Sequence, residues 1–312
     1  MLGADDLVRR DDAVLQIAQL AKKRFHPVTI EIGGVVVEAR FEWPEAAAVY
    51  RRRYRHMLAT SAPRFVAHVA GWKAGEVYFW ISGGATYFWG HSQVGANEAS
   101  FLMDAVVNTT VFNSTEDLIA LHAGAVGDGA SVAALVGTTT AGKSTTSIAC
   151  ARRGLELYSD EFCLATPRGV LPCPRSLNLR EGGIELLARD SAPASPIDAW
   201  LLRNRGADRE NVGFDDLFGD PRIPEPRPLR LAFIVTGVGA NPQALPVTPA
   251  RMLVQVEPWA RMKPRGIDAA SALHALLRDV ASYELTLGKP DDTARLIGEM
   301  LASARKDVKR IA

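Results

Sequence analysis

One stretch of the chain, from Gly137 to Ser144, has the pattern G-x-x-x-x-G-K-S. The apolar residues 131–136 before it predict a buried strand, and residues 144–153 after it predict a helix. A loop in this setting points backbone N–H groups and the positive end of a helix dipole at an anion. We therefore expect a phosphate-binding loop, in which Lys143 reaches the β- and γ-phosphates of a nucleoside triphosphate and the Ser144 hydroxyl holds Mg²⁺. The expected nucleotide-binding residues are Gly137, Thr138, Thr139, Thr140, Ala141, Gly142, Lys143, Ser144 and Thr145.

Two further groups could take part in phosphate chemistry. Phosphoryl transfer needs a phosphate cradle, a divalent metal, an acid that holds the metal, and a group that positions or deprotonates the nucleophile. The pair Asp160-Glu161 follows the short apolar stretch 155–158, where a metal-binding acid is expected at a strand end, with exposed turn carboxylates as the alternative. His122 lies on the strand predicted before the loop, although a lone histidine among apolar residues is commonly a core residue.

The spacing of these residues resembles the HPr kinase/phosphorylase family and its kinase-like relatives. His122 lies 21 residues before Lys143, Arg153-Gly154 follow that lysine by 10 and 11 residues, and Asp160-Glu161 follow it by 17 and 18. The match runs from His122 to Glu161 without a gap. It extends loosely to Tyr283–Gly288 and the helix predicted after it.

The resemblance implies a phosphate-loop kinase domain with a fold like that of phosphoenolpyruvate carboxykinase, in which the loop follows a β-hairpin. Residues 121–126 and 131–136, joined by Gly127-Asp128-Gly129, predict such a hairpin. The resemblance also implies that Glu161 is the general base that acts on an acceptor serine and that His122 lies beside the phosphates. The implied catalytic residues are His122, Lys143, Asp160 and Glu161, and the implied metal ligands are Ser144 and Asp160.

The chain departs from the family pattern in two places. It has Asp-Glu at 160–161 where the family usually has Asp-Asp. Asn178 stands where the family has a later acidic metal ligand, and Glu181 is the candidate replacement. Both differences argue against HPr as the substrate and against the reverse phosphorylase reaction.

The leading expectation is an ATP-dependent, Mg²⁺-requiring kinase that phosphorylates a hydroxyl group. A Ser or Thr of a peptide or protein is the preferred acceptor, and a small molecule is the other. One alternative is a nucleotide-dependent regulatory ATPase or switch whose N-terminal region recognises a partner. Another is a GTP-dependent carboxykinase-like enzyme, disfavoured because the metal-binding His, Lys and Asp set expected for it is not evident. The resemblance also implies a homo-oligomer.

Composition indicates which partners and which cellular location to expect for the protein. With 47% hydrophobic residues, 23% charged residues and a net charge of +1, neither nucleic acid nor a membrane is expected as a partner. The basic run Arg51–His56 is either a solvated helix face or a docking patch for an acidic partner. Three cysteines fit neither a zinc site nor a disulfide framework, and charges interrupt the N-terminus, so a cytoplasmic location without a signal peptide is expected.

Residue patterns predict a mixed α/β (α+β) fold in two parts: an N-terminal α+β region, 1–115, for substrate or partner recognition, and a kinase domain, 116–312. Helices are predicted at 1–25, 44–58, 97–108, 270–280 and 291–304. Further strands are predicted at 28–32, 35–41, 155–158, 162–165, 170–171 and 231–235, and within 64–90, with turns at Ala74-Gly75 and Gly83-Gly84. Residues 190–229, rich in Pro, Asp and Arg, predict a long surface segment, either an acceptor-side lid or a disordered insertion.

Overall fold

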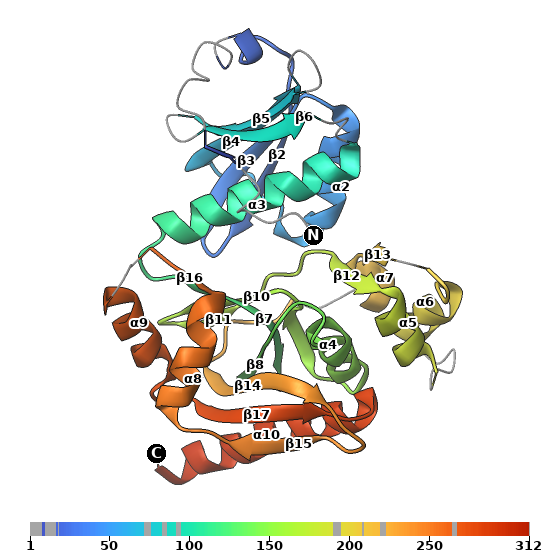
Figure 1. Cartoon of the computed structure of the whole chain (residues 1–312), viewed down its shortest axis with the longest axis vertical. Helices are drawn as coiled ribbons and strands as arrows, with labels where there is room; N and C mark the ends of the chain where they lie inside the picture. The colour runs from blue at the N-terminus through green and yellow to red at the C-terminus, as the bar shows by residue number, and fades with distance from the viewer. Residues whose placement is uncertain are drawn as a thin grey trace. The chain divides into compact units, whose positions relative to one another are not determined.

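The computed structural model describes residues 8–9, 17, 19–71, 76–82, 86–91, 95–189, 195–207, 209–218, 223–263 and 267–311. The chain divides into two compact units, Met1–Ser114 and Thr115–Ala312, and each is described by itself (Figure 1). Both units mix helices and strands, which confirms the mixed α and β fold expected from the sequence. Within the described residues, no helix combines the length and the hydrophobicity that a membrane crossing needs.

The first unit is built on a six-stranded sheet in the order β1-β6-β5-β4-β3-β2. Its strands are β1 (Val8–Arg9), β2 (His26–Ile32), β3 (Val35–Phe41), β4 (Phe65–Gly71), β5 (Glu76–Ile81) and β6 (Thr86–His91). Its helices are α2 (Pro44–Arg53), the 3₁₀ helix η3 (Arg55–Met57) and α3 (Ala96–Ser114). The β2–β3 turn places Gly33 and Gly34 at φ of 58° and 80°, values that glycine adopts without steric cost. A buried ion pair, Arg53 Nη2 to Asp104 Oδ2 at 2.8 Å, joins α2 to α3.

Two helix predictions in this unit need correction. Val8–Arg9, inside the helix predicted at 1–25, pairs with β6 instead, because an edge strand offers unpaired backbone groups that a local helix cannot satisfy. Ile17, Gln19 and Leu20 are helical, while 21–25 is not. The helix predicted at 44–58 ends at Arg53 and continues as a 3₁₀ turn. The rest of 1–16, residue 18 and the turns at 74–75 and 83–84 lie outside the described residues.

The second unit contains a larger sheet in the order β11-β10-β7-β8-β14-β17-β15, and β9 and β16 also pair with β7. Its strands are β7 (Ile119–Gly127), β8 (Val132–Val136), β9 (Glu156–Ser159), β10 (Phe162–Thr166), β11 (Gly169–Leu171), β12 (Leu177–Arg180), β13 (Arg209–Val212), β14 (Leu229–Val238), β15 (Gln243–Pro246), β16 (Ala260–Arg261) and β17 (Ala281–Leu287). Its helices are α4 (Lys143–Arg152), α5 (Glu181–Ala188), α6 (Pro196–Arg203), α7 (Phe214–Phe218), α8 (Pro249–Val256), η5 (Glu257–Trp259), α9 (Ile267–Leu277) and α10 (Pro290–Ile311).

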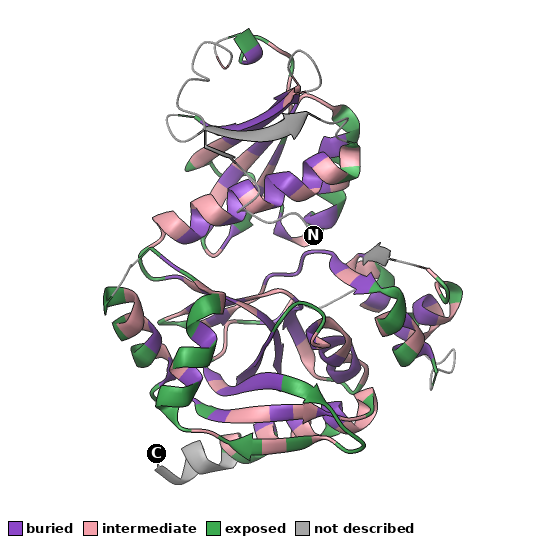
Figure 2. Ribbon diagram, viewed as in Figure 1, coloured by how far each residue is buried: buried purple, intermediate pink, exposed green. Residues whose placement is uncertain are grey.

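Alternation along β8 explains how this sheet is covered on both faces. Ala133 and Leu135 pack in a core with residues of α4 and α10, whereas Val132, Ala134 and Val136 pack in a second core with residues of α8 and α9. Figure 2 shows the strands between these helices as mainly buried, with exposure at the end of β14. β8 is antiparallel to β7 and parallel to β14, so the predicted hairpin before the loop is confirmed.

The interpretation of residues 190–229 as a weakly anchored surface segment is wrong for the described residues. They form α6, β13, α7 and the start of β14. Ile197, Trp200 and Leu201 have the i, i+3, i+4 spacing of a buried helix stripe and pack in the same core as α4. Val212, Phe214 and Leu217 join that core as well. The Pro, Asp and Arg content masked this pattern, because those residues lie at the ends and outer faces of short elements.

Candidate functional site

The glycine-rich loop, residues 137–142, joins the carboxyl end of β8 to the amino end of α4. Gly142 is the N-cap of α4 and has a φ of 95°. A Cβ on Gly142 would lie 2.7 Å from Leu287 Cδ1, the end of a side chain that would have to shift, and the left-handed backbone conformation favours glycine there. The loop therefore ends at a helix N-terminus, where unpaired backbone N–H groups and the helix dipole favour an anion.

The rest of the loop is also tightly constrained. A Cβ on Gly137 would lie 3.3 Å from the Cβ atoms of both Ala141 and Val235. Thr140 has a φ of 72°, a conformation in which a β-branched residue is a genuine outlier. Backbone strain of this kind persists only where the surrounding structure enforces it, and it is concentrated at functional sites.

Lys143 begins α4, and its side chain folds back under the loop. Its Nζ donates to the carbonyl oxygen of Gly137 at 2.8 Å and to that of Thr138 at 3.0 Å. The residue is only 7% exposed. Burial lowers the pKa of Lys143 to about 8, and the nearby Asp160 carboxylate opposes that shift. The ammonium group is thus mainly charged at neutral pH, and it lies beside the loop that would hold an anion.

The acidic pair lies at the turn between β9 and β10, as predicted. Asp160 is 4% exposed, and its Oδ2 accepts a hydrogen bond from the backbone N–H of Asn178 at 3.4 Å. Ser159 Oγ accepts from the backbone N–H groups of Glu161 at 3.2 Å and Phe162 at 2.9 Å, which fixes the turn. The Glu161 side chain is 27% exposed. The two acids therefore differ: Asp160 is buried near the lysine, and Glu161 remains accessible to a second molecule.

Strand β7 places His122 between the loop and the acids. Ala123 pairs with Val136, the last residue of β8, while His122 itself pairs with Phe162 on the opposite edge. The backbone N–H of Ala123 donates to the carbonyl oxygen of Glu161 at 3.0 Å. Ala123 therefore contacts both the end of β8, where the glycine-rich loop begins, and the turn that carries the acids.

The surroundings of His122 keep its ring neutral. The ring is partly buried, with its centroid 6.2 Å from that of Phe162 and 5.9 Å from that of Trp259. Burial, followed by the positive charges of Lys143, Arg175 and Arg261, lowers the pKa of His122 to about 4. A neutral imidazole can donate from one nitrogen and accept at the other, but it adds no positive charge at neutral pH.

The β12–α5 segment lies against the first turn of α4. A Cβ on Gly183, in α5, would lie 2.8 Å from Thr145 Oγ1. Ser144 is partly exposed beside this contact. The segment that the resemblance singled out reaches Asp160 through the backbone N–H of Asn178, on β12, while Glu181 lies exposed at the start of α5.

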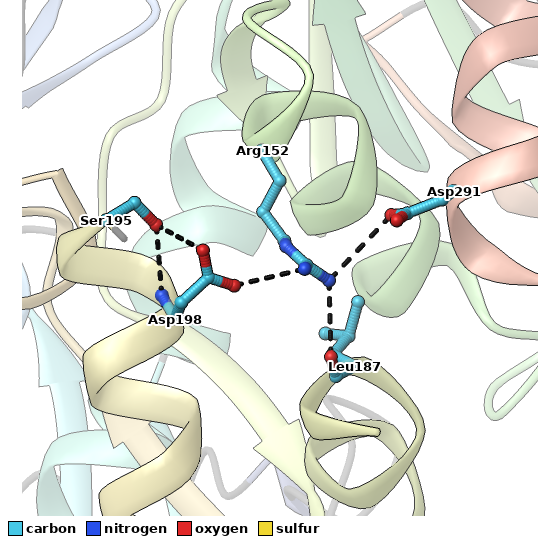
Figure 3. Close-up of polar contacts among 5 residues, drawn as sticks. All are labelled: Arg152, Leu187, Ser195, Asp198 and Asp291. Carbon is cyan, nitrogen blue, oxygen red and sulfur yellow. Dashed lines mark hydrogen bonds and ion pairs between the residues drawn. The ribbon is translucent and has the colours of Figure 1, made fainter. Parts of the chain in front are cut away.

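The far end of α4 is anchored through Arg152 (Figure 3). Its Nη2 lies 3.0 Å from Asp198 Oδ1 in α6, and its Nη1 donates to the carbonyl oxygen of Leu187 in α5 at 3.2 Å. Asp291 Oδ1, in α10, lies 3.8 Å from Nη1. Asp198 also accepts from Ser195 Oγ at 2.7 Å, within the N-cap of α6. Three elements are therefore held to the helix that carries Lys143 and Ser144.

Sequence reasoning missed Arg175. This residue is 2% exposed, forms an ion pair with Glu161, and has its Cζ 5.0 Å from the centroid of the Phe162 ring. It lies in the connection between β11 and β12, which has no periodic pattern. The only signal was a charged residue inside the apolar and proline-rich run 170–175. Trp259 and Arg261 were missed as well, because η5 and β16 are too short to predict.

The loop, Lys143, the acidic pair and His122 thus gather at one corner of the second unit, although they come from four elements. Comparison with protein-family models and with curated proteins finds no match for this chain. The functional assignment therefore depends on the chemistry of these residues.

Proposed function

We propose that the chain is an ATP-dependent phosphotransferase of the HPr-kinase-like type, which uses Mg²⁺ and transfers the γ-phosphate to a hydroxyl group. The observation that supports this proposal is the gathering of Lys143, Asp160 and Glu161 beside a strained glycine-rich loop at a helix N-terminus. Phosphoryl transfer depends on positioning and charge stabilisation, and these residue types supply both.

The residues present fit a triphosphate and a magnesium ion. The N-terminus of α4 and the Lys143 ammonium suit phosphate oxygens. The Ser144 hydroxyl and the Asp160 carboxylate are hard oxygen donors of the kind that Mg²⁺ prefers. Among the described residues, no three His, Cys, Asp or Glu side chains form a cluster that could hold a metal. Mg²⁺ bound together with a triphosphate commonly uses only one or two protein ligands, since phosphate and water oxygens complete its shell.

Each acid has a different part in the proposed reaction. A bond forms between the acceptor oxygen and the γ-phosphorus, the bond to the leaving diphosphate breaks, and the hydroxyl proton passes to a base. Glu161 is assigned as that base because its side chain is 27% exposed and an acceptor can approach it. Asp160 is buried beside Lys143 and is assigned to the metal. Neutral His122 is assigned to hydrogen bonding beside the phosphates.

A peptide or protein Ser or Thr is the proposed acceptor class. The test is transfer of label from γ-labelled ATP to size-fractionated peptides and proteins, with small metabolites as a separate fraction. Glu161→Gln should retain nucleotide affinity and lose roughly 10²–10⁴-fold in transfer rate, the usual contribution of a general base. Lys289→Met, at an exposed lysine, is the control and should behave as wild type.

Three outcomes would contradict this proposal or a part of it. If Glu161→Gln is near wild type and Asp160→Asn is inactive, the base is Asp160. If wild type binds and hydrolyses ATP but labels no fraction, the protein is a nucleotide-dependent switch. If neither ATP nor GTP binds, the phosphate-loop assignment itself is wrong.

A further inference from the structure

Arg175 contacts two consecutive residues of the candidate site. Its Nη2 forms an ion pair with Glu161 Oε2, and its guanidinium carbon lies 5.0 Å from the centroid of the Phe162 ring. Its own backbone N–H donates to the carbonyl oxygen of Cys173 at 2.9 Å, which fixes the turn from which the side chain extends. At 2% exposure, this side chain is more buried than the carboxylate it contacts.

Stability alone explains this arrangement poorly. A buried ion pair often contributes little to stability, because the loss of hydration offsets the attraction. A hydrophobic residue would fill the same space without that loss. A buried guanidinium does, however, present a planar fork of donors in a fixed orientation, which suits the positioning of a carboxylate. The ring of Phe162 further restricts the plane of the guanidinium.

We propose that Arg175 is a positioning residue for Glu161, an inference that rests on the function proposed above. The ion pair holds Oε2, so the carboxylate plane is fixed and Oε1 is the oxygen that takes the acceptor proton. Arg175 keeps its own proton throughout and touches neither the acceptor nor the phosphates.

The experiment compares Arg175→Met, Arg175→Lys and the exposed control Arg168→Met in the full-length protein. The transfer kcat of Arg175→Met should fall by at least about tenfold and at most the roughly 10²–10⁴-fold attributed to a general base. Its ATP affinity, measured by titration without an acceptor, should stay within about twofold of wild type, because the phosphate cradle is untouched. Arg175→Lys should recover part of the rate, since it keeps the charge but not the fork.

A second comparison separates positioning from general damage to the fold. In a Glu161→Gln background, Arg175→Met should cause little further loss of kcat, because the two residues act as one unit. Full additivity would overturn the inference, as would a normal transfer rate in Arg175→Met. If Arg175→Met lowers kcat only in proportion to its unfolded fraction, the role is structural and the inference is wrong. Wild-type protein without any transfer activity would instead overturn the proposed function, and this inference with it.

Discussion

The sharpest physical prediction concerns Gly142, where a left-handed backbone conformation and a close side-chain contact coincide. Its φ of 95° is left-handed, and a Cβ would lie 2.7 Å from Leu287 Cδ1. A left-handed alanine costs about 1–2 kcal/mol, reduced by roughly 0.4–1 kcal/mol because alanine also restricts the unfolded chain. Overpacking against Leu287 adds about 1–3 kcal/mol. Gly142→Ala should therefore lower the free energy of unfolding by about 1–5 kcal/mol in total.

Gly154 is the matched control at the other end of α4. Its φ is 86°, and a Cβ there would meet nothing within 4 Å. It caps the helix, with the backbone N–H of Leu155 bonded to the carbonyl oxygen of Cys150 at 3.1 Å. Gly154→Ala should thus show the conformational cost alone, about 1 kcal/mol. The difference between the two variants measures the contact with Leu287.

Urea unfolding followed by circular dichroism provides the measurement, and a double-mutant cycle with Leu287→Ala makes it specific. Leu287→Ala alone should cost about 2–5 kcal/mol as a cavity-forming change. In the double variant the new Cβ has space. The loss of unfolding free energy in the double variant should therefore be about 1–3 kcal/mol smaller than the sum of the losses in the two single variants. Equal costs at Gly142 and Gly154 would refute the steric argument. A cost well under 1 kcal/mol at Gly142 would show that Leu287 moves aside freely and would also refute the steric argument.

Three further predictions follow from charges around α4. ATP affinity should fall above about pH 8, because Lys143 loses its proton there. Titrations of the protein with ATP at a series of pH values would measure this fall, and a constant affinity up to about pH 10 would contradict the charge assignment. The pKa of His122 is about 4 in the folded state and about 6.5 in the unfolded chain, so His122 in the unfolded chain gains a proton as the pH falls from about 6.5 to 4, and this destabilises the fold. His122→Phe should remove roughly 3 kcal/mol of that acid destabilisation, measured by urea unfolding at pH 4 and pH 7. An unchanged pH dependence of stability would be inconsistent with a buried neutral ring. Arg152→Met should lower the free energy of unfolding by about 3–5 kcal/mol, because it leaves the largely buried Asp198 carboxylate without its cation. Arg153→Met, at an exposed neighbouring arginine, is the control and should have a small effect. Equal effects of the two variants on unfolding would show that the ion pair contributes nothing.

Local patterns predicted the elements that carry their own signals. The hairpin before the loop, the loop helix with its cap at Gly154, and the buried stripe Ala294, Ile297 and Leu301 of α10 are confirmed. Each has a turn residue, a cap or an apolar period that acts within a few residues of chain. The helix predicted at 270–280 forms at Ile267–Leu277, a shift at each end that these signals cannot resolve.

Tertiary contacts decided the elements that were missed or misread. Strand β15 is largely exposed at the sheet edge and lacks an alternation of buried apolar residues. Strand β12 alternates buried leucines with polar residues, but it is only four residues long and its described partner is the equally short β13, which is distant in sequence. The position of Arg175 depends on a turn fixed by Cys173 rather than on any period. The positions of Lys143 at the helix start and of Asp160 and Glu161 at a strand end could be predicted from type and spacing. The residue that forms an ion pair with Glu161 could not, because it comes from a segment with no pattern of its own.

Under the proposed function, the packing of residues 195–207 and 209–218 bears on the acceptor. Apolar residues of these ranges pack in the same core as α4, and Asp198 in α6 forms an ion pair with Arg152. We therefore expect these residues to form a wall of the site rather than a segment that closes over the acceptor. Exclusion of water, which a lid would otherwise provide, would then depend on the acceptor itself and on the buried setting of Lys143 and Asp160. An acceptor with a large contact surface satisfies this requirement better than a small molecule does. The anchoring of α6 to α4 is therefore a physical argument, separate from any resemblance, for proposing a peptide or protein hydroxyl as the acceptor.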